Sequence, residues 1–171
     1  DKPLKHYVLQ SSLNFPHTDV LVSTDSEEIS EYSMMLGASV IHRPKYLTKS
    51  STSVKEICYH ALKNLEKKGL IYEKCLVLHP KFPLIEQQTM KKFFSNLQND
   101  VQTVFGVTQI VDSKLNYTLK NDSKHLLKLK PSNNTSALLN RIVSFKTKNF
   151  LKQKEKFLGP YHGLILSNNE L

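Results

Sequence analysis

The amino-acid sequence predicts an α/β fold, in which a mostly parallel sheet lies between layers of helices. Short apolar runs alternate with longer amphipathic stretches through the first two thirds of the chain. The run at 75–78 is continuously apolar, as in strands that are buried on both faces. Alternation of strands with helical stretches is typical of parallel βα units. We expect a single domain over residues 1–171, since domains commonly run to roughly 100–200 residues.

The first expected elements are a helix, a strand and a second helix. Leucine and valine side chains recur at helical spacing over residues 3–13, which predicts an amphipathic helix. An apolar run at 19–24 predicts a strand. Glu27 and Glu28 follow this strand, and acidic side chains stabilise the positively polarised start of a helix. We therefore expect a helix over 26–36.

The clearest helix begins at Ser53. Ser53 and Glu56 have the spacing of a capping box, in which each side chain bonds the other residue's backbone N–H. Hydrophobic residues then recur on one face as far as Gly69, where the helix is expected to end. The other elements expected in this part are strands at 38–41 and 103–107 and a helix at 87–98.

The sequence pattern changes after position 107. Apolar and polar residues alternate in two short runs, which predicts either short exposed strands or a hairpin. We expect a β-rich subregion over 110–160 that packs beside the α/β part. Its expected elements are strands at 115–119, 126–129 and 142–145, a polar loop at 131–136 and a lysine-rich helix at 149–157, followed by a strand at 161–166.

The net charge of +9 is confined to one quarter of the chain. Residues 114–156 contain 11 of the 24 basic and 2 of the 15 acidic residues, and the remainder is neutral. Aromatic residues lie among these bases, but no nucleic-acid-binding motif accompanies them, so we do not expect nucleic acid as a partner. Two interpretations stay open. The lysines either steer a small anionic substrate or form a solvated surface.

The cysteine and hydropathy patterns narrow the class of protein. Cys58 and Cys75 make neither a disulfide framework nor a metal-ligand spacing, which favours a reducing, cytoplasmic compartment. No apolar run approaches the roughly 18 residues of a membrane span, so we expect no membrane as a partner. Zinc-ligand and Ser-His-Asp hydrolase motifs are not found, and the pattern names neither catalytic residues nor metal ligands.

Polar residues follow the expected strands at the edge where α/β sheets bind ligands. Arg43 offers a planar fork of donors for phosphates or carbonyl edges, and a surface ion pair is the alternative. Ser50, Thr52 and Ser53 make a hydroxyl-rich approach to a helix N-terminus, where anions bind, although capping alone explains Ser53. The Ser-Thr-Asp run at 23–25 either caps the next helix or binds a ligand.

The loop after the apolar strand is a further candidate. Pro80 and Pro83 fix its shape, and His79 and Lys81 are expected to project from the ligand-binding edge of the sheet. A rigid loop at this edge indicates a function. As a lone histidine, His79 does not by itself indicate acid–base catalysis.

Taken in order, these motifs resemble the acylneuraminate cytidylyltransferases, or CMP-sialic acid synthetases. The likeness covers essentially the whole chain and holds without gaps from Val22 to Leu62. Its residues are Lys2-Pro3-Leu4, Val22-Ser23-Thr24-Asp25, Glu27-Glu28-Ile29, Gly37-Ala38, Val40, Arg43-Pro44, Leu47, Ser50–Ser53 and His60-Ala61-Leu62.

The resemblance implies a three-layer, Rossmann-like nucleotidyltransferase sheet and a homodimer, with the basic subregion beside the sugar-acid pocket. Members of that family transfer CMP from CTP to a sialic acid or a related nonulosonic acid and release pyrophosphate with Mg²⁺. Their catalysis is mostly positioning and charge neutralisation at phosphorus. By the same resemblance, the nucleotide-binding residues are Arg43, Ser50, Thr52, Ser53, His79 and Pro80, and the substrate-binding residues are Lys81 and Asn140.

The chain departs from the family pattern at the central loop. Residues 79–85 read His-Pro-Lys-Phe-Pro-Leu-Ile, where the family has Gln-Pro-Thr-Ser-Pro-Leu-Arg. The resemblance places the family's triphosphate loop before Asp1 and its metal-binding Asp-x-Asp pair after Leu171, so we expect neither within this sequence. The alternative to an active enzyme is a catalytically degenerate homologue that serves as a binding or oligomerisation module.

Overall fold

A computed structural model describes residues 2–98, 100–110, 117–119, 126–128, 135–153 and 156–170. The helices are α1 (Leu4–Leu13), α2 (Glu27–Met35), α3 (Val54–Lys67), α4 (Gln87–Ser95) and α5 (Thr147–Lys152), with short 3-10 turns at Lys45–Leu47 and Asn168–Glu170. The strands are β1 (Leu21–Thr24), β2 (Ser39–His42), β3 (Lys74–Val77), β4 (Thr103–Ile110), β5 (Tyr117–Leu119), β6 (Leu126–Lys128), β7 (Thr135–Lys146) and β8 (Tyr161–Ile165).

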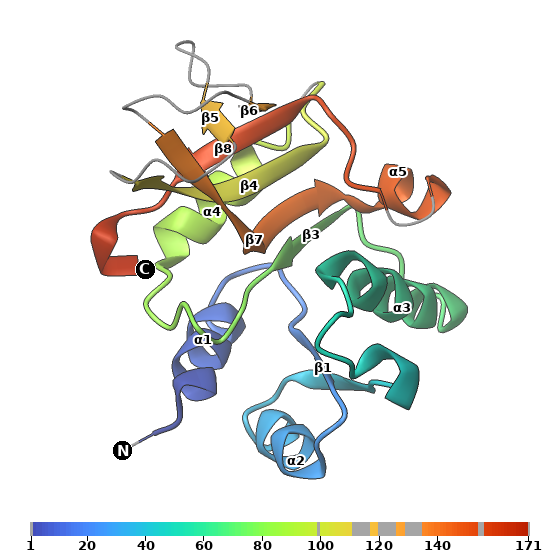
Figure 1. The fold of residues 1–171 in the computed structure, drawn as a ribbon. Coiled ribbons are helices and arrows are strands. Elements are labelled where there is room, and N and C mark those ends of the chain that lie inside the picture. The colour runs from blue at the N-terminus through green and yellow to red at the C-terminus, as the bar shows by residue number, and fades with distance from the viewer. Residues whose placement is uncertain are drawn as a thin grey trace.

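The described strands form a parallel pair, a mixed sheet and a small hairpin (Figure 1). β1 pairs with β2 in parallel. The larger sheet has the order β3-β7-β4-β8, in which β4 and β8 are parallel and β7 runs antiparallel to both of its neighbours. β5 and β6 pair antiparallel, as the alternating pattern predicted. The predicted α/β class is confirmed, with β7 as the antiparallel member of the larger sheet.

Local sequence signals start the helices where they were expected. The Ser53 hydroxyl accepts a hydrogen bond from the Glu56 N–H at 3.3 Å, and the Glu56 carboxylate accepts one from the Ser53 N–H at 2.7 Å, which completes the predicted capping box. Ser26 caps α2 by accepting a bond from the Ile29 N–H. Gly37 follows α2 with a φ of 98°, a left-handed conformation that favours glycine.

The core lies on both faces of the four-stranded sheet. On one face, Met90 and Phe93 of α4 pack with Val104 and Ile142. On the other face, helices α3 and α5 pack against Val143 and further aromatic side chains. Successive side chains of a strand point to opposite faces, so consecutive residues of β7 serve different core clusters. Figure 1 shows this layering, with α4 and α3 on opposite sides of the sheet.

Three expectations about element boundaries and burial are wrong. β7 extends over 135–146, well beyond the expected strand at 142–145, because β4 and β3 pair with it and hold polar sequence in a strand. The helix expected at 149–157 is α5, which ends at Lys152. The apolar strand at 75–78 packs on both faces, since Leu76 contacts one core cluster and Cys75 and Val77 contact the other, but every residue of β3 is half-buried and not fully buried as expected. Among the described residues, no helix is long and apolar enough to cross a membrane.

Candidate functional site

Arg43 follows β2 and turns back toward β1. Its backbone N–H donates to the Thr24 carbonyl at 2.7 Å, and its guanidinium Nη2 donates to the Ser23 carbonyl at 2.5 Å. Among the described residues the ion pairs are those of Lys5 and Lys63, so Arg43 is not held in the surface ion pair that was the alternative interpretation. The guanidinium is instead fixed at the carboxyl end of β1.

Three buried polar atoms around this position have no hydrogen-bond partner in the described structure: Ser23 Oγ, Arg43 Nε and His60 Nδ1. Asn64 Nδ2 lies 3.1 Å from His60 Nε2, and an amide nitrogen only donates, so the neutral ring carries its proton on Nδ1. Burial, followed by the positive charges of Lys67 and Arg43, lowers the pKa of His60 and favours this neutral form.

Unsatisfied buried donors are costly and uncommon. Each such group costs roughly 1–3 kcal/mol, and native proteins keep few of them. In this protein the Arg43 Nε–H and the His60 Nδ1–H are both donors without acceptors in the described structure. The positive charge of Arg43 also contributes, after burial and Lys67, to the lowered pKa of His60. The arrangement suits a ligand that presents hydrogen-bond acceptors and little positive charge.

The hydroxyl-rich stretch before α3 is already engaged in capping. The Glu56 carboxylate accepts bonds from both the N–H and the hydroxyl of Ser53, at 2.7 and 2.8 Å. These bonds lower the pKa of Glu56, so this N-terminus carries a fixed negative charge of its own. Ser50 is exposed and Thr52 is half-buried. Their contact with a nucleotide stays a prediction.

The loop after β3 forms a tight turn. The Lys81 N–H donates to His79 Nδ1 at 3.2 Å, and the Phe82 N–H donates to the His79 carbonyl at 3.0 Å. Pro80 and Lys81 are exposed. At its far end the loop is anchored, because Ile85 is 3% exposed in the core and its carbonyl accepts a bond from the Ser11 hydroxyl.

Asn140 lies where the pairing of β4 with β7 changes register. Phe105 pairs with Val143, whereas Gly106 pairs with Leu139, so three residues of β7 bulge between them. Bulges re-aim side chains and are frequent beside active sites. The side chain of Asn140 lies outside the described part, as do the side chains of most of the basic subregion at 110–160, and both assignments stay predictions.

The structure thus sorts the predicted residues into separate groups. Arg43 is joined to Ser23 and lies near His60, which the sequence pattern had not assigned to the site. His79, Pro80 and Lys81 share one turn. Ser50, Thr52 and Ser53 belong to the start of α3, and Asn140 to the β7 bulge. His60 was present in the His-Ala-Leu motif of the resemblance, but no spacing rule linked it to Arg43.

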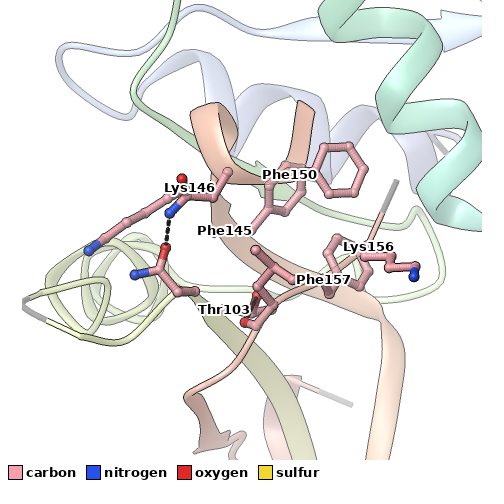
Figure 2. Close-up of a pocket in the computed structure, with 9 residues that line it drawn as sticks. Thr103, Phe145, Lys146, Phe150, Lys156 and Phe157 are labelled. Carbon is pink, nitrogen blue, oxygen red and sulfur yellow. Dashed lines mark hydrogen bonds between the residues drawn. The ribbon is translucent and has the colours of Figure 1, made fainter. Parts of the chain in front are cut away.

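A small hollow lies elsewhere in the molecule, away from the predicted site residues. It has no interior space for even a water molecule, so it is not a ligand pocket, since such pockets hold roughly 300–1,000 Å³. Figure 2 shows Phe145, Phe150 and Phe157 facing one another beside it, with ring centroids 4.4 to 5.4 Å apart. The backbone N–H of Lys146 donates to the Gln102 carbonyl across its rim. None of the predicted site residues lines this hollow.

The part of the chain that the structure describes holds no complete ligand set for a metal. No three His, Cys, Asp or Glu side chains come together there. Mg²⁺ is normally held by one or two carboxylates with water and substrate phosphates. The carboxylates of Glu56 and Glu170 are both engaged as helix caps, which leaves them unsuited to that role.

Comparisons with known proteins agree on the fold. One solved structure similar to this chain is a CMP:2-keto-3-deoxy-manno-octonic acid synthetase complexed with CTP, at a TM-score of 0.71 and 10% identity, covering 96% of this chain and 79% of that one. A 4-diphosphocytidyl-2C-methyl-D-erythritol synthase from Anaerococcus prevotii matches at 0.66 and 11%, covering 99% and 79%. HddC from Yersinia pseudotuberculosis matches at 0.61 and 13%, covering 94% and 75%.

At these identities the solved structures establish the fold alone. The search of curated proteins gave no significant match. The family comparison is decisive, since the model described as "Cytidylyltransferase" matches residues 1–157 of the 171. The chain belongs to the cytidylyltransferase family.

Proposed function

We propose that the protein transfers CMP from CTP to a sialic acid or a related nonulosonic acid and releases pyrophosphate. In this reaction the anomeric oxygen of the sugar acid bonds to the α-phosphorus of CTP. The bond from that phosphorus to the bridging oxygen breaks, pyrophosphate leaves, and the hydroxyl proton passes to solvent. Family membership supports the nucleotide, and the motifs shared with the acylneuraminate enzymes support the sugar acid.

The observation that carries the nucleotide assignment is the pair of unpartnered donors at Arg43 and His60. Cytosine presents two neighbouring acceptors, O2 and N3, whereas uracil carries a proton on N3. Two donors that face this pair of acceptors therefore favour cytosine over uracil. Arg43 is fixed to the end of β1 by its bond to Ser23, so its remaining N–H is held ready for the base.

The family pattern implies that Mg²⁺ serves the triphosphate, where it would neutralise charge. The described residues do not supply a ligand set for it, so no step is assigned to the metal. A homodimer and a cytoplasmic location complete the proposal. Both cysteines are free thiols, as is usual in a reducing compartment.

Pyrophosphate release tests the activity directly. The protein is incubated with CTP or UTP, Mg²⁺ and a panel of sugar acids. We expect release with CTP and a nonulosonic acid, and a strong preference for CTP over UTP. Release with neutral sugars alone would contradict the proposed acceptor, and equal use of UTP would contradict the base assignment.

The Arg43→Lys variant tests what the guanidinium group of Arg43 contributes to CTP binding. Lysine keeps the charge but loses the fixed fork and the Nε–H, so we expect kcat/KM for CTP to fall by about 10- to 100-fold, the equivalent of one charge-assisted hydrogen bond. Lys45→Ala is the matched control, since Lys45 is exposed two residues away. Equal activity in the two variants would rule out Arg43 as a nucleotide contact.

A second candidate function is binding without catalysis, favoured by the altered loop at 79–85. A protein of this kind binds CTP or CDP in calorimetry but releases no pyrophosphate with any acceptor. Sedimentation velocity then separates a monomeric binder from the oligomerisation module.

A further inference from the structure

We propose that Asn64 is a positioning residue that sets the base preference of the candidate nucleotide site by fixing the tautomer of His60. The inference rests on the proposed function, since it takes cytosine as the base that the site binds. Asn64 acts through His60 and not by a contact of its own with the nucleotide.

The amide group of Asn64 is held in one orientation. Asn64 lies one helical turn after His60 on α3, so the two side chains share a face of the helix. Its Nδ2 donates to the His60 backbone carbonyl at 2.8 Å and lies 3.1 Å from His60 Nε2. A carbonyl oxygen only accepts hydrogen bonds, so the amide presents its nitrogen here and not its oxygen. One amide hydrogen serves the carbonyl, and the other is available to Nε2.

This contact determines where the imidazole of His60 carries its proton. The tautomer of a neutral histidine is set by the hydrogen bond that the other ring nitrogen makes. Because Nε2 accepts from Asn64, the proton is on Nδ1, which is buried and has no partner within the described residues. Burial, with the positive charges of Lys67 and Arg43, lowers the pKa of His60 and keeps the ring neutral.

The three unpartnered atoms around Arg43 differ in how they can bond a base. Arg43 Nε only donates, since a guanidinium does not lose its proton in proteins. Ser23 Oγ can both donate and accept, so it suits the amino group of cytosine and the carbonyl oxygen of uracil. His60 Nδ1 donates in one tautomer and accepts in the other, so its character depends on Asn64.

Cytosine and uracil differ at the ring atom that a tautomer can distinguish. Both bases present the O2 acceptor, which suits the Arg43 Nε–H in either case. N3 accepts a hydrogen bond in cytosine but carries a proton in uracil. His60 Nδ1–H therefore pairs with N3 of cytosine, whereas in the uracil complex two donors would oppose each other in a buried place. The other tautomer would reverse this preference.

NMR of protein labelled with nitrogen-15 histidine reads the tautomer without any nucleotide. Protonated and bare ring nitrogens have distinct chemical shifts, and the His60 signals are those that disappear in His60→Phe. We expect a proton on Nδ1 in the parent protein and a mixture of tautomers in Asn64→Leu. In Asn64→Asp at about pH 8 we expect the proton on Nε2, because a carboxylate accepts from Nε2–H.

Titration with CTP and with UTP at the same pH reads the base preference. We expect the parent protein to bind CTP at least about tenfold more tightly than UTP. Asn64→Leu should reduce this ratio of Kd values at least about threefold, and Asn64→Asp should reverse the order of the two nucleotides. The negative charge of Asn64→Asp repels both triphosphates alike, so the ratio reports the base.

Asn96 provides the matched control. It is half-buried like Asn64, and its Nδ2 donates at 2.8 Å to the carbonyl of the residue one turn back, which is Lys92 in place of a histidine. Asn96→Leu and Asn96→Asp should leave the CTP to UTP ratio within about twofold of the parent value. Circular dichroism reports retained folding, and Asn64→Asp carries the test if Asn64→Leu unfolds.

A double-mutant cycle separates positioning from a general structural role. In the His60→Phe background, Asn64→Leu should no longer change the ratio, because Asn64 acts through His60. The inference is overturned by a parent His60 ring that carries its proton on Nε2. It is also overturned by a ratio that the Asn64 variants leave unchanged, or change equally with and without His60.

Failure of the proposed function has a different signature. Absence of pyrophosphate release with every sugar acid would contradict the proposed transfer and leave both readouts intact, because neither depends on turnover. A parent protein that binds UTP as tightly as CTP would overturn the base assignment and the role of Asn64 together.

Discussion

At the residue scale, Glu170 is a buried carboxylate that caps a helix distant in sequence. It is 4% exposed and accepts bonds from the Glu86 N–H at 3.3 Å and from the N–H and hydroxyl of Ser167 at 3.1 and 2.9 Å. Glu86 is the N-cap residue of α4 and makes no side-chain cap of its own. The carboxylate of Glu170 therefore supplies the negative charge that the start of α4 favours.

Replacing Glu170 tests this cap. Burial on its own raises the pKa of Glu170, but hydrogen bonds from Thr89, Ser167 and Glu86 outweigh it, so the pKa lies below its usual value. This stabilisation is present above the unfolded-state pKa and is lost as pH falls through the folded pKa. We expect Glu170→Gln to lower the free energy of unfolding by about 1–3 kcal/mol at pH 7, and by less near pH 3.

Urea unfolding at the two pH values measures the difference between the variant and the parent protein. Glu31→Gln is the control, since Glu31 is exposed on α2. Equal losses in the two variants, or a Glu170→Gln loss that is the same at both pH values, would show that the carboxylate is not a cap.

The two thiols are held protonated. Burial, with a contribution from Cys75, raises the pKa of Cys58 well above its usual value, and burial raises the pKa of Cys75 to about 12. Thiolates are the reactive form, so both cysteines should be inert in the native protein at about pH 8.

Iodoacetamide labelling followed by mass spectrometry checks this expectation. We expect labelling of Cys58 and Cys75 only at the rate at which the protein opens, and full labelling in urea. An exposed reference thiol, introduced as Ser51→Cys, should react immediately. Immediate reaction of Cys58 or Cys75 in the native protein would contradict the burial argument.

At the scale of elements, the start of α3 separates capping from ligand binding. Ser53→Ala removes the acceptor for the Glu56 N–H, and we expect a loss of about 1 kcal/mol in unfolding free energy. Ser53→Asp keeps an acceptor for the Glu56 N–H but loses the hydroxyl bond to the Glu56 carboxylate, so we expect a stability loss similar to that of Ser53→Ala, while the added negative charge should repel CTP.

Thermal unfolding and CTP titration of both variants decide the role of Ser53. If Ser53 contacts the nucleotide, Ser53→Asp weakens CTP binding far more than Ser53→Ala does, although the two variants have similar stability. If capping is its whole role, Ser53→Asp binds CTP like the parent protein. Ser51→Asp is the control for a change in general charge, since Ser51 is exposed two residues away.

At the scale of the whole molecule, the two core clusters belong to one part of the fold. Both clusters are built on the four-stranded sheet with α3, α4 and α5, and no residue of β1, α2 or β2 belongs to either. The β1–β2 unit is tied to the rest by polar contacts such as His6 with Tyr32 and Tyr72 with Asp19. Regions with few buried apolar contacts open at lower free energy than the core.

Native-state hydrogen exchange tests this difference. We expect the Ile41 amide, which lies in the β1–β2 ladder, to open at a lower free energy than the amides of Val104 and Val143. One common opening free energy across all three sites would show that the molecule unfolds as a single unit.

Much of the fold and part of the site could be predicted, because their signals are local. The capping box of Ser53 and Glu56 spans four residues, and the strand at 19–24 and the helix after it depend on neighbours in sequence. The position of Arg43 at the end of a strand was also predictable. Its bond to Ser23 was not, because that bond requires β2 to lie beside β1.

The sequence by itself determined the α/β class, the order of helices and strands, and the family motifs. Tertiary structure decided which polar groups are left unpaired and which are satisfied. Glu170 reaches Glu86 across 84 positions, and β7 takes its length and bulge from two neighbours at once. Local propensity determines where a helix or strand begins. A strand register, or a helix cap supplied by a residue distant in sequence, depends on segments that only folding brings together.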